Sequence, residues 1–220
     1  MSIGHQTADT GSVQGVPSLA ATRGNPPWEV ATLFPLQGEW TEEDYLELES
    51  STKRMIELVD GCLEVLPMPT NAHQFILRFL FRVFDSFVVA HELGEVLFAP
   101  LPVRFDKKNY REPDLIYFRK GRELTPSGYP QTADLAIEIV SDGPRDRKRD
   151  FEDKRIEYAR RGIEEYWIVD PKLSEVSVLR LEGGEYREFG KFVPGENASS
   201  VLLKGLAVNV QELFEAGKGR

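Results

Sequence analysis

The chain has 220 residues, 41% of them hydrophobic, which is enough for one sizeable core or at most two small ones. Its 27 Lys and Arg residues against 36 Asp and Glu residues give a formal net charge of −9. A protein that binds nucleic acid non-specifically is usually basic, because contacts to phosphates supply most of its affinity. The acidic balance therefore argues against a simple DNA-coating role. It does not exclude an enzyme that binds DNA through a local basic patch and a bound cation.

Cysteine and histidine are scarce. The single cysteine, Cys62, rules out a disulfide framework and a Cys-based zinc site, and it fits a reducing, cytoplasmic setting. With only three histidines, a zinc hydrolase is disfavoured. The start of the chain lacks the apolar core of a signal peptide, and no apolar run approaches the roughly 18 to 20 residues that cross a bilayer. We expect a soluble protein with no membrane partner.

The first part of the chain predicts a leader, a short helix and a hairpin. Gly, Ser, Thr and Pro dominate residues 1–27, which predicts a flexible leader before a single domain at residues 28–220. Thr41 is a good helix N-cap, and the acidic residues after it suit the first turn of a helix in "WTEEDYLELES". Two strands follow in "RMIELVDGCLEVLP", paired as a hairpin across the central Asp-Gly.

The middle of the chain alternates helices and strands. Dense apolar residues predict a long, largely buried helix that starts at His73 and ends at Gly94, and a second helix ends at Gly162. We interpret the core at residues 71–170 as helix, three strands, helix, strand, which leaves one of the five strand-like segments below outside the core order. We also expect a C-terminal hairpin across Glu182-Gly183-Gly184. The predicted fold is an α/β or α+β domain with a mixed central sheet flanked by helices. The strand-like segments are "EVLFAP", "LPVRFD", "EPDLIYF", "ADLAIEIVS" and "EEYWIVD", and a last short helix lies at "NVQELFE".

A glutamate lies in the middle of the predicted strand "ADLAIEIVS". Side chains alternate between the two faces of a strand, so Glu138 shares a face with small or apolar residues such as Ala136 and Val140. An ionised carboxylate in apolar surroundings is costly unless it is paired, protonated or bound to a metal. The sequence therefore predicts a partner for Glu138.

Asp114 is the first candidate for that partner. It begins the apolar run of the preceding strand, so the two carboxylates can lie close together if the strands pair. Two carboxylates at close range repel unless a proton or a cation lies between them. Oxygen ligands select hard cations, and Mg²⁺ is typically held by one or two carboxylates with water and phosphate. This arrangement suits metal-assisted hydrolysis of a phosphodiester.

A lysine on the next helix can supply a third group. Lys154 falls between Phe151 and Tyr158, which mark the inward face of that helix, and it can reach back over the end of the sheet. We expect Tyr158 to be a core residue and Arg149 to face solvent. The charged segment at residues 145–150, "RDRKRD", reads as a loop, and in a nuclease it would be a phosphate-contacting edge.

The run "PDLIYF … ADLAIEIVS … FEDKRIEYARRGIEEYWIVDP", with "IELVDGCLEVLPMP" upstream and His73 opening the long helix, resembles the Uma-two family. Its members are bacterial restriction-endonuclease-like proteins. The similarity covers about residue 38 to the C-terminus, and four separate motifs match in order. It implies the PD-(D/E)xK nuclease fold, whose helix, three strands, helix, strand core agrees with the predicted order of elements.

The resemblance also implies roles for particular residues. Asp114 corresponds to the motif aspartate and Glu138 to the motif acid, with Mg²⁺ or Mn²⁺ as the cofactor. The usual lysine of the nuclease superfamily lies two residues after that acid, and Val140 occupies this position here. In the Uma-two family the lysine lies on the following helix, where it corresponds to Lys154. Glu57 corresponds to a further acid of the metal site.

Other residues are candidates for substrate contact. His73 and Gln74 match the polar helix start of the family. Arg145, Arg147 and Lys148 lie in the charged segment that we interpret as a phosphate-contacting loop. The resemblance also suggests DNA as the substrate and a homodimer, since a dimer cuts two strands most easily.

Each of the main site residues also has an ordinary structural interpretation. Glu138 could be a salt-bridged or edge-exposed carboxylate, Asp114 a strand-start residue and Lys154 a surface lysine. Glu57, on a hairpin, is most simply a solvent-side residue, and His73 the polar start of a helix. Two hypotheses follow. One is a metal-dependent endonuclease, and the other is a non-catalytic nucleic-acid or protein interaction module in which the charges form a buried ionic cluster.

Overall fold

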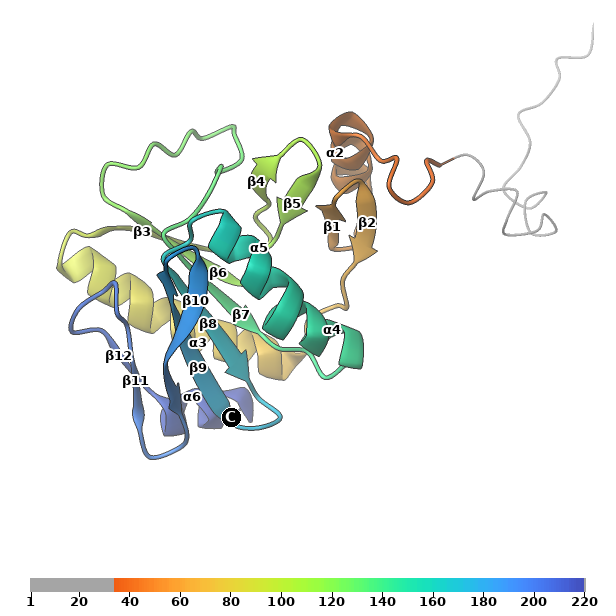
Figure 1. The fold of residues 1–220 in the computed structure, drawn as a ribbon. Helices are drawn as coiled ribbons and strands as arrows, with labels where there is room; N and C mark the ends of the chain where they lie inside the picture. The colour runs from red at the N-terminus through yellow and green to blue at the C-terminus, as the bar shows by residue number, and fades with distance from the viewer. Residues whose placement is uncertain (1–33, 220) are drawn as a thin grey trace, which may run out of the picture. The chain divides into compact units, whose positions relative to one another are not determined.

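The computed structural model describes residues 34–219, so the predicted leader lies outside the described residues. Figure 1 shows the arrangement of the elements. The helices are α2 (Glu42–Ser51), α3 (Asn71–Ala90), α4 (Pro144–Lys148), a π-helical segment η2 (Arg149–Asp153), α5 (Lys154–Arg160) and α6 (Val210–Gly217). The strands are β1 (Ile56–Val59), β2 (Cys62–Val65), β3 (Gly94–Phe98), β4 (Val103–Asp106), β5 (Asn109–Arg111), β6 (Leu115–Arg119), β7 (Leu135–Ile139), β8 (Glu165–Asp170), β9 (Glu175–Glu182), β10 (Glu185–Phe192), β11 (Asn197–Ser199) and β12 (Ala207–Asn209).

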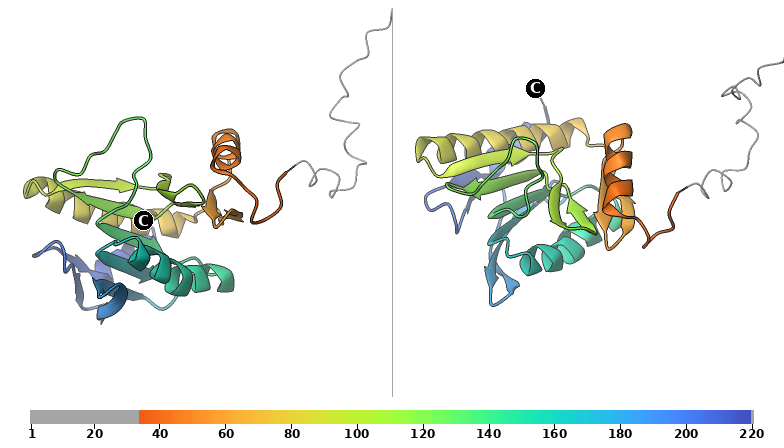
Figure 2. Two further views of the ribbon diagram at one scale, coloured as in Figure 1. Left: turned by 45° about the horizontal axis from the view of Figure 1, so that its top comes forward. Right: turned by 90° about the horizontal axis from the view of Figure 1, so that it is seen from above.

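The central sheet has six strands in the order β10-β9-β8-β7-β6-β3. Strands β7 and β8 run parallel, and every other neighbouring pair runs antiparallel. Helix α3 covers one face, and the helical stretch α4–η2–α5 covers the other, as the right-hand view of Figure 2 shows. The predicted mixed sheet flanked by helices is confirmed, and a parallel β7–β8 pair is what a helical crossover between two strands requires.

Alternation along β7 decides which core each side chain joins. Leu135, Ile137 and Ile139 pack in the core under α3, whereas Ala136 and Val140 pack in the core under α5. The predicted division of faces is confirmed. Helix α3 contributes a stripe of buried residues at every fourth position, which explains its dense apolar sequence: Ile76, Leu80, Phe84 and Val88.

A second sheet, in the order β2-β1-β5-β4, lies beside the central one and carries α2. The predicted hairpin is confirmed, because Asp60 and Gly61 both have positive φ angles, of 49° and 76°, as the tight turn between β1 and β2 requires. The predicted cap of α2 is also confirmed, since the Thr41 side chain accepts a hydrogen bond from Asp44 N–H. Tyr45 of α2 is fully buried against Tyr110 of β5, with ring centroids 4.8 Å apart.

Two predicted boundaries are wrong. Gly94 does not end the long helix, because α3 stops at Ala90 and Gly94 is the first residue of β3. Its φ of +144° and its contact with the neighbouring strand leave no room for a side chain: a Cβ there would lie 1.9 Å from the Phe118 carbonyl oxygen. The segment 145–150 is not a loop, since α4 and the first residues of η2 contain it. Pro144 lies in the first turn of α4, a position that proline favours. The prediction of a loop rested on the charged residues and did not use this proline.

Strands β5, β11 and β12 lie in segments that the sequence reading assigned to no element. Each has only three residues, too few for a period of two to stand out. Among residues 34–219, no helix combines the length and the apolar composition needed to cross a membrane.

Candidate functional site

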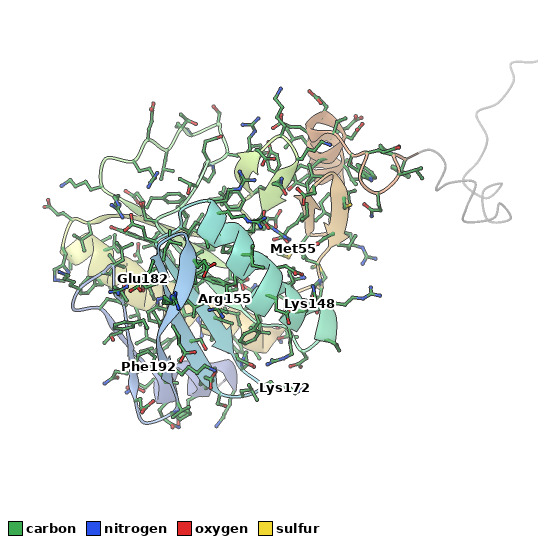
Figure 3. All side chains as sticks on the ribbon, viewed as in Figure 1. Met55, Lys148, Arg155, Lys172, Glu182 and Phe192 are labelled. Carbon is green, nitrogen blue, oxygen red and sulfur yellow. The ribbon has the colours of Figure 1, made fainter. Side chains whose placement is uncertain are left out.

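A cavity of about 260 Å³ opens at the carboxyl end of β7, between the start of α3 and the helical stretch η2–α5. Carboxylates and cations share its wall with an apolar rim that includes Met55, whose side chain is labelled in Figure 3. The charged or ionisable lining residues used below are His73, Glu112, Asp114, Glu138, Arg149, Asp150 and Lys154. Charges from four different elements therefore converge on one hollow.

Strand pairing brings Asp114 to Glu138. Strands β6 and β7 are antiparallel with Leu115 opposite Ile137, and one further step of this register pairs Asp114 with Glu138. Asp114 Oδ2 accepts a hydrogen bond from the Ile139 N–H at 2.7 Å, and Asp114 Oδ1 lies 3.2 Å from His73 Nε2. The carboxylate of Asp114 is thus fixed by the strand on one side and by the start of α3 on the other.

Glu138 is buried, and its partners come from α5. Its Oε1 atom accepts hydrogen bonds from Lys154 Nζ at 2.8 Å and from the Tyr158 hydroxyl at 2.6 Å. Burial raises the pKa of Glu138, Lys154 opposes the rise, and the nearby carboxylates of Asp150 and Asp114 add to it. Both hydrogen bonds go to Oε1, which leaves Oε2 for a ligand in the cavity. Additional positive charge in the cavity would favour the ionised form of Glu138.

Lys154 is the first residue of α5 and only 1% exposed. Its Nζ atom contacts three carboxylates, at 2.8 Å from Glu138, 3.3 Å from Glu57 and 3.9 Å from Asp150. Burial works against the charge, but the carboxylates outweigh it and raise the pKa of Lys154 above its usual value. Lys154 is therefore charged at neutral pH and is no surface lysine.

The π-helical segment η2 widens the helix just before Lys154 and presents Arg149 and Asp150 to the cavity. Arg149 Nε lies 3.1 Å from Asp150 Oδ1, and Arg149 Nη1 lies 2.9 Å from Asp146 Oδ1. The expectation that Arg149 faces solvent is wrong, because its side chain is only 15% exposed. Sequence reasoning missed Asp150. Asp150 lies four residues before Lys154 and eight before Tyr158, and this spacing indicates that the three side chains share one face of a helix.

Glu57 lies behind Lys154 and does not line the cavity. The ordinary interpretation of Glu57 as a solvent-side residue is wrong, since its side chain is fully buried. Glu57 Oε2 accepts from Arg111 Nη1 at 2.7 Å, and Oε1 accepts from the Glu112 N–H at 2.9 Å. Burial alone would raise the pKa of Glu57, but Lys154 and Arg111 lower it to about 2. Both oxygens are engaged, so the described geometry makes Glu57 an anchor for Lys154.

The candidate substrate-contacting residues divide into two groups. His73 and Gln74, at the start of α3, line the cavity. The three basic residues of α4 do not line it. Arg147 pairs with Asp170 at 2.7 Å, Lys148 pairs with Asp153 at 2.9 Å and projects from α4 (Figure 3), and Arg145 is exposed.

Asp114 and Glu138 are the two residues that could hold a metal ion. Residues 34–219 contain no group of three or more His, Cys, Asp or Glu side chains arranged to hold one. A Mg²⁺ ion needs only one or two carboxylates when water and phosphate oxygens complete its shell, so this donor set fits a hard cation. Glu112 adds a buried Oε2 atom without a hydrogen-bond partner, and burial together with Glu57 raises the pKa of Glu112 to about 7. An unsatisfied buried oxygen at the same cavity favours a cation there.

Comparisons with known proteins agree with this geometry. The model of the Uma2 family, described as "Putative restriction endonuclease", matches residues 42–211. A crystal structure of "a putative nuclease belonging to DUF820 from Anabaena variabilis ATCC 29413" is similar, with a TM-score of 0.66 and 21% sequence identity. The match covers 83% of this chain and 99% of that chain, and it establishes the restriction-endonuclease-like fold. No curated protein matches the chain.

Proposed function

The chain belongs to the Uma2 family of restriction-endonuclease-like proteins, and from this premise we propose that it is a metal-dependent endonuclease that hydrolyses phosphodiester bonds of DNA. The observation that carries the proposal is the convergence of Asp114, Glu138 and Lys154 on one open cavity. A purely structural ionic cluster has no need of an open hollow on one side of it.

Asp114 and Glu138 are the proposed ligands of Mg²⁺ or Mn²⁺. When bound, the ion would lower the pKa of a coordinated water and offset charge on the leaving oxygen. The strand N–H of Ile139 and the His73 imidazole hold the Asp114 carboxylate in a fixed orientation. The Tyr158 hydroxyl and Lys154 do the same for Glu138, so both carboxylates are preorganised before any ligand enters.

Lys154 and Arg149 are the proposed electrostatic partners of the scissile phosphate. Lys154 is held as a cation by three carboxylates and lines the cavity, where it would position a water or neutralise developing charge. Arg149 reaches the same wall from η2 and offers a guanidinium to phosphate oxygens. Glu57 keeps Lys154 in place and stands outside the proposed metal shell.

The second candidate function is an interaction module without catalysis. The observation in its favour is that Lys154 already satisfies Glu138 and Glu57 in a buried network, and such networks can serve specificity of folding alone. The two functions differ in one respect: only the nuclease needs a bound cation and chemistry at Glu138.

The test is cleavage of supercoiled plasmid in EDTA, Mg²⁺ or Mn²⁺ by the parent chain, Asp114→Asn and Glu138→Gln. Asp153→Asn, a half-exposed carboxylate of the same helical stretch, is the matched control. We expect metal-dependent nicking by the parent and the control and none by the two site variants. Equal nicking by all four proteins would reveal a contaminant. No nicking by the parent would favour the interaction module. Sedimentation of the parent chain tests the proposed homodimer.

A further inference from the structure

A second hollow, of about 330 Å³, lies beside the proposed catalytic cavity between α3 and the edge strand β3. The two hollows adjoin at both walls. On the helix side, Gln74 lines both hollows. On the strand side, Phe98 of the second hollow is followed directly by Ala99 and Pro100, which line the catalytic cavity. A strand of substrate that leaves the cavity on this side would therefore pass over this hollow.

Half of the residues that line the second hollow are phenylalanines: Phe75, Phe81 and Phe98. Phe98 is 48% exposed, and its ring meets that of Phe81 edge to face with centroids 4.8 Å apart. Phe75 forms another part of the lining and lies under the guanidinium of Arg78, 5.2 Å from its ring centroid. An exposed aromatic ring such as that of Phe98, beside a nuclease site, is suited to stacking with an unpaired base, and such stacking is tolerant of sequence because every base has a π face.

Two arginines lie on the side of α3 that faces the second hollow. Arg78 and Arg82 are exposed and follow Gln74 at intervals of four, so the three side chains form one row along the helix. In the part of the chain that the structure describes, neither arginine forms an ion pair with a carboxylate, unlike Arg149 at the cavity and Arg104 and Arg111 in the second sheet. Exposed guanidinium groups without a carboxylate partner fit the phosphates of a polyanion.

We propose that the hollow formed by Phe75, Phe81 and Phe98 binds an unpaired base of the substrate strand, with Arg78 and Arg82 contacting the phosphates beside it. The proposal rests on the proposed nuclease function and adds a substrate class, nucleic acid with a single-stranded segment next to the cut. A second copy of the chain fits the hollow less well. A two-fold contact there would bring the arginine rows of the two copies together, and like charges oppose such a contact.

The test is binding of a labelled single-stranded oligonucleotide and of a matched duplex hairpin to the full chain, followed by fluorescence anisotropy in EDTA so that nothing is cut. The variants are Phe98→Ala and Phe98→Tyr, which keeps a ring. Phe189→Ala is the matched control, because Phe189 on β10 is 47% exposed and lies outside the hollow. We expect Phe98→Ala to weaken single-strand binding by between about five-fold and a hundred-fold, with duplex binding unchanged. Phe98→Tyr and Phe189→Ala should bind like the parent.

A second measurement tests the arginines. Arg78→Ala should reduce the slope of log affinity against log salt for the single strand by about 0.7, and Arg187→Ala, an exposed arginine of β10, should not. The proposal is overturned if Phe98→Ala binds as Phe189→Ala does, if single-strand and duplex binding fall together, or if no oligonucleotide binds. It is also overturned if Phe98→Ala only separates a dimer. Plasmid nicking that depends on Glu138 would survive any of these outcomes, so the nuclease and the base-binding hollow can fail separately.

Discussion

Lys154 lies 2.8 Å from Glu138 although 16 residues separate them in the chain. The superfamily resemblance places a lysine two residues after the acid, on the same strand, and here that position is Val140. Val140 is buried in the apolar core under α5, where a lysine would lose its hydration. The cation is delivered instead from the first turn of α5. The acid and its cation are thus in contact although they come from different elements of the fold.

The ion pair predicts a specific pattern of stability. Lys154→Met leaves Glu138 and Glu57 buried without their common cation, and loss of one partner of a buried pair typically costs about 3–5 kcal/mol. We expect the free energy of unfolding in urea at pH 7 to fall by that order. The double variant Lys154→Met with Glu138→Gln should be more stable than Lys154→Met alone. Equal stability of the two variants would mean that Glu138 does not depend on Lys154.

Tyr158 predicts a smaller and separable effect. Its hydroxyl donates to Glu138 at 2.6 Å, while its ring packs edge to face on Phe105 and Tyr166. Tyr158→Phe keeps the ring and removes the hydrogen bond, so we expect a loss of about 1.5–3 kcal/mol in the free energy of unfolding. We also expect a slower metal-dependent nicking rate, because Glu138 then loses one of its two fixed contacts. An unchanged rate with lowered stability would limit Tyr158 to a structural role.

Much of this site was predictable from particular residues. Alternation along one strand identified Glu138, and the strand before it identified Asp114. The inward face of the next helix identified Lys154. Asp150 was missed although it lies four residues before Lys154, a spacing that puts two side chains on one face of a helix. Arg149 was expected to face solvent, and the π-helical segment that presents it to the cavity has no clear signature in the sequence. Glu57 was misplaced because its burial depends on Arg111, a partner more than fifty residues away.

The prediction of the fold failed for the same reason, because contacts between residues distant in the chain are not visible in the local sequence. Long helices and the central strands follow from local periodicity, which the sequence contains. Helix α4 was mistaken for a loop because its charged residues pair with groups outside it, such as Asp170, and these pairs exist only in the folded chain. Gly94 was assigned to a helix end, although close contact with β6 is what requires a glycine there.

Metal binding should stabilise the chain independently of any cleavage. If Asp114 and Glu138 hold the ion, Mn²⁺ at a hundred times its dissociation constant should add about 2.7 kcal/mol to the free energy of unfolding. For a domain of this size we expect a rise of about 5–10 °C in Tm. Asp114→Asn should abolish the rise, and the control Asp153→Asn should keep it. A rise that persists in Asp114→Asn would place the ion elsewhere.

Asp134 predicts how acid unfolds the domain. It is 1% exposed, and Arg122 holds both of its oxygens, with Nε 2.9 Å from Oδ2 and Nη2 2.5 Å from Oδ1. Burial alone would raise the pKa of Asp134, but the bonds from Arg122 and from the Arg119 N–H outweigh it, so the pKa lies below its usual value. In the unfolded chain Asp134 regains a pKa near 3.9. Its contribution to stability is therefore fully present above that pH and is lost as the pH falls through the lower value of the folded state.

Asp134→Asn isolates this contribution. At pH 7 we expect the variant to lose about 1–3 kcal/mol of the free energy of unfolding, because the Arg122 guanidinium loses its charged partner. Below pH 4 the difference between parent and variant should shrink, since the parent carboxylate is then being protonated as well. Urea unfolding at pH 7, 5, 4 and 3 measures the difference directly. The exposed pair of Lys120 and Glu92 provides the control, and Glu92→Gln should change the stability by less than about 1 kcal/mol at every pH. A difference for Asp134→Asn that stays constant down to pH 3 would show that the Asp134 carboxylate does not titrate in that range.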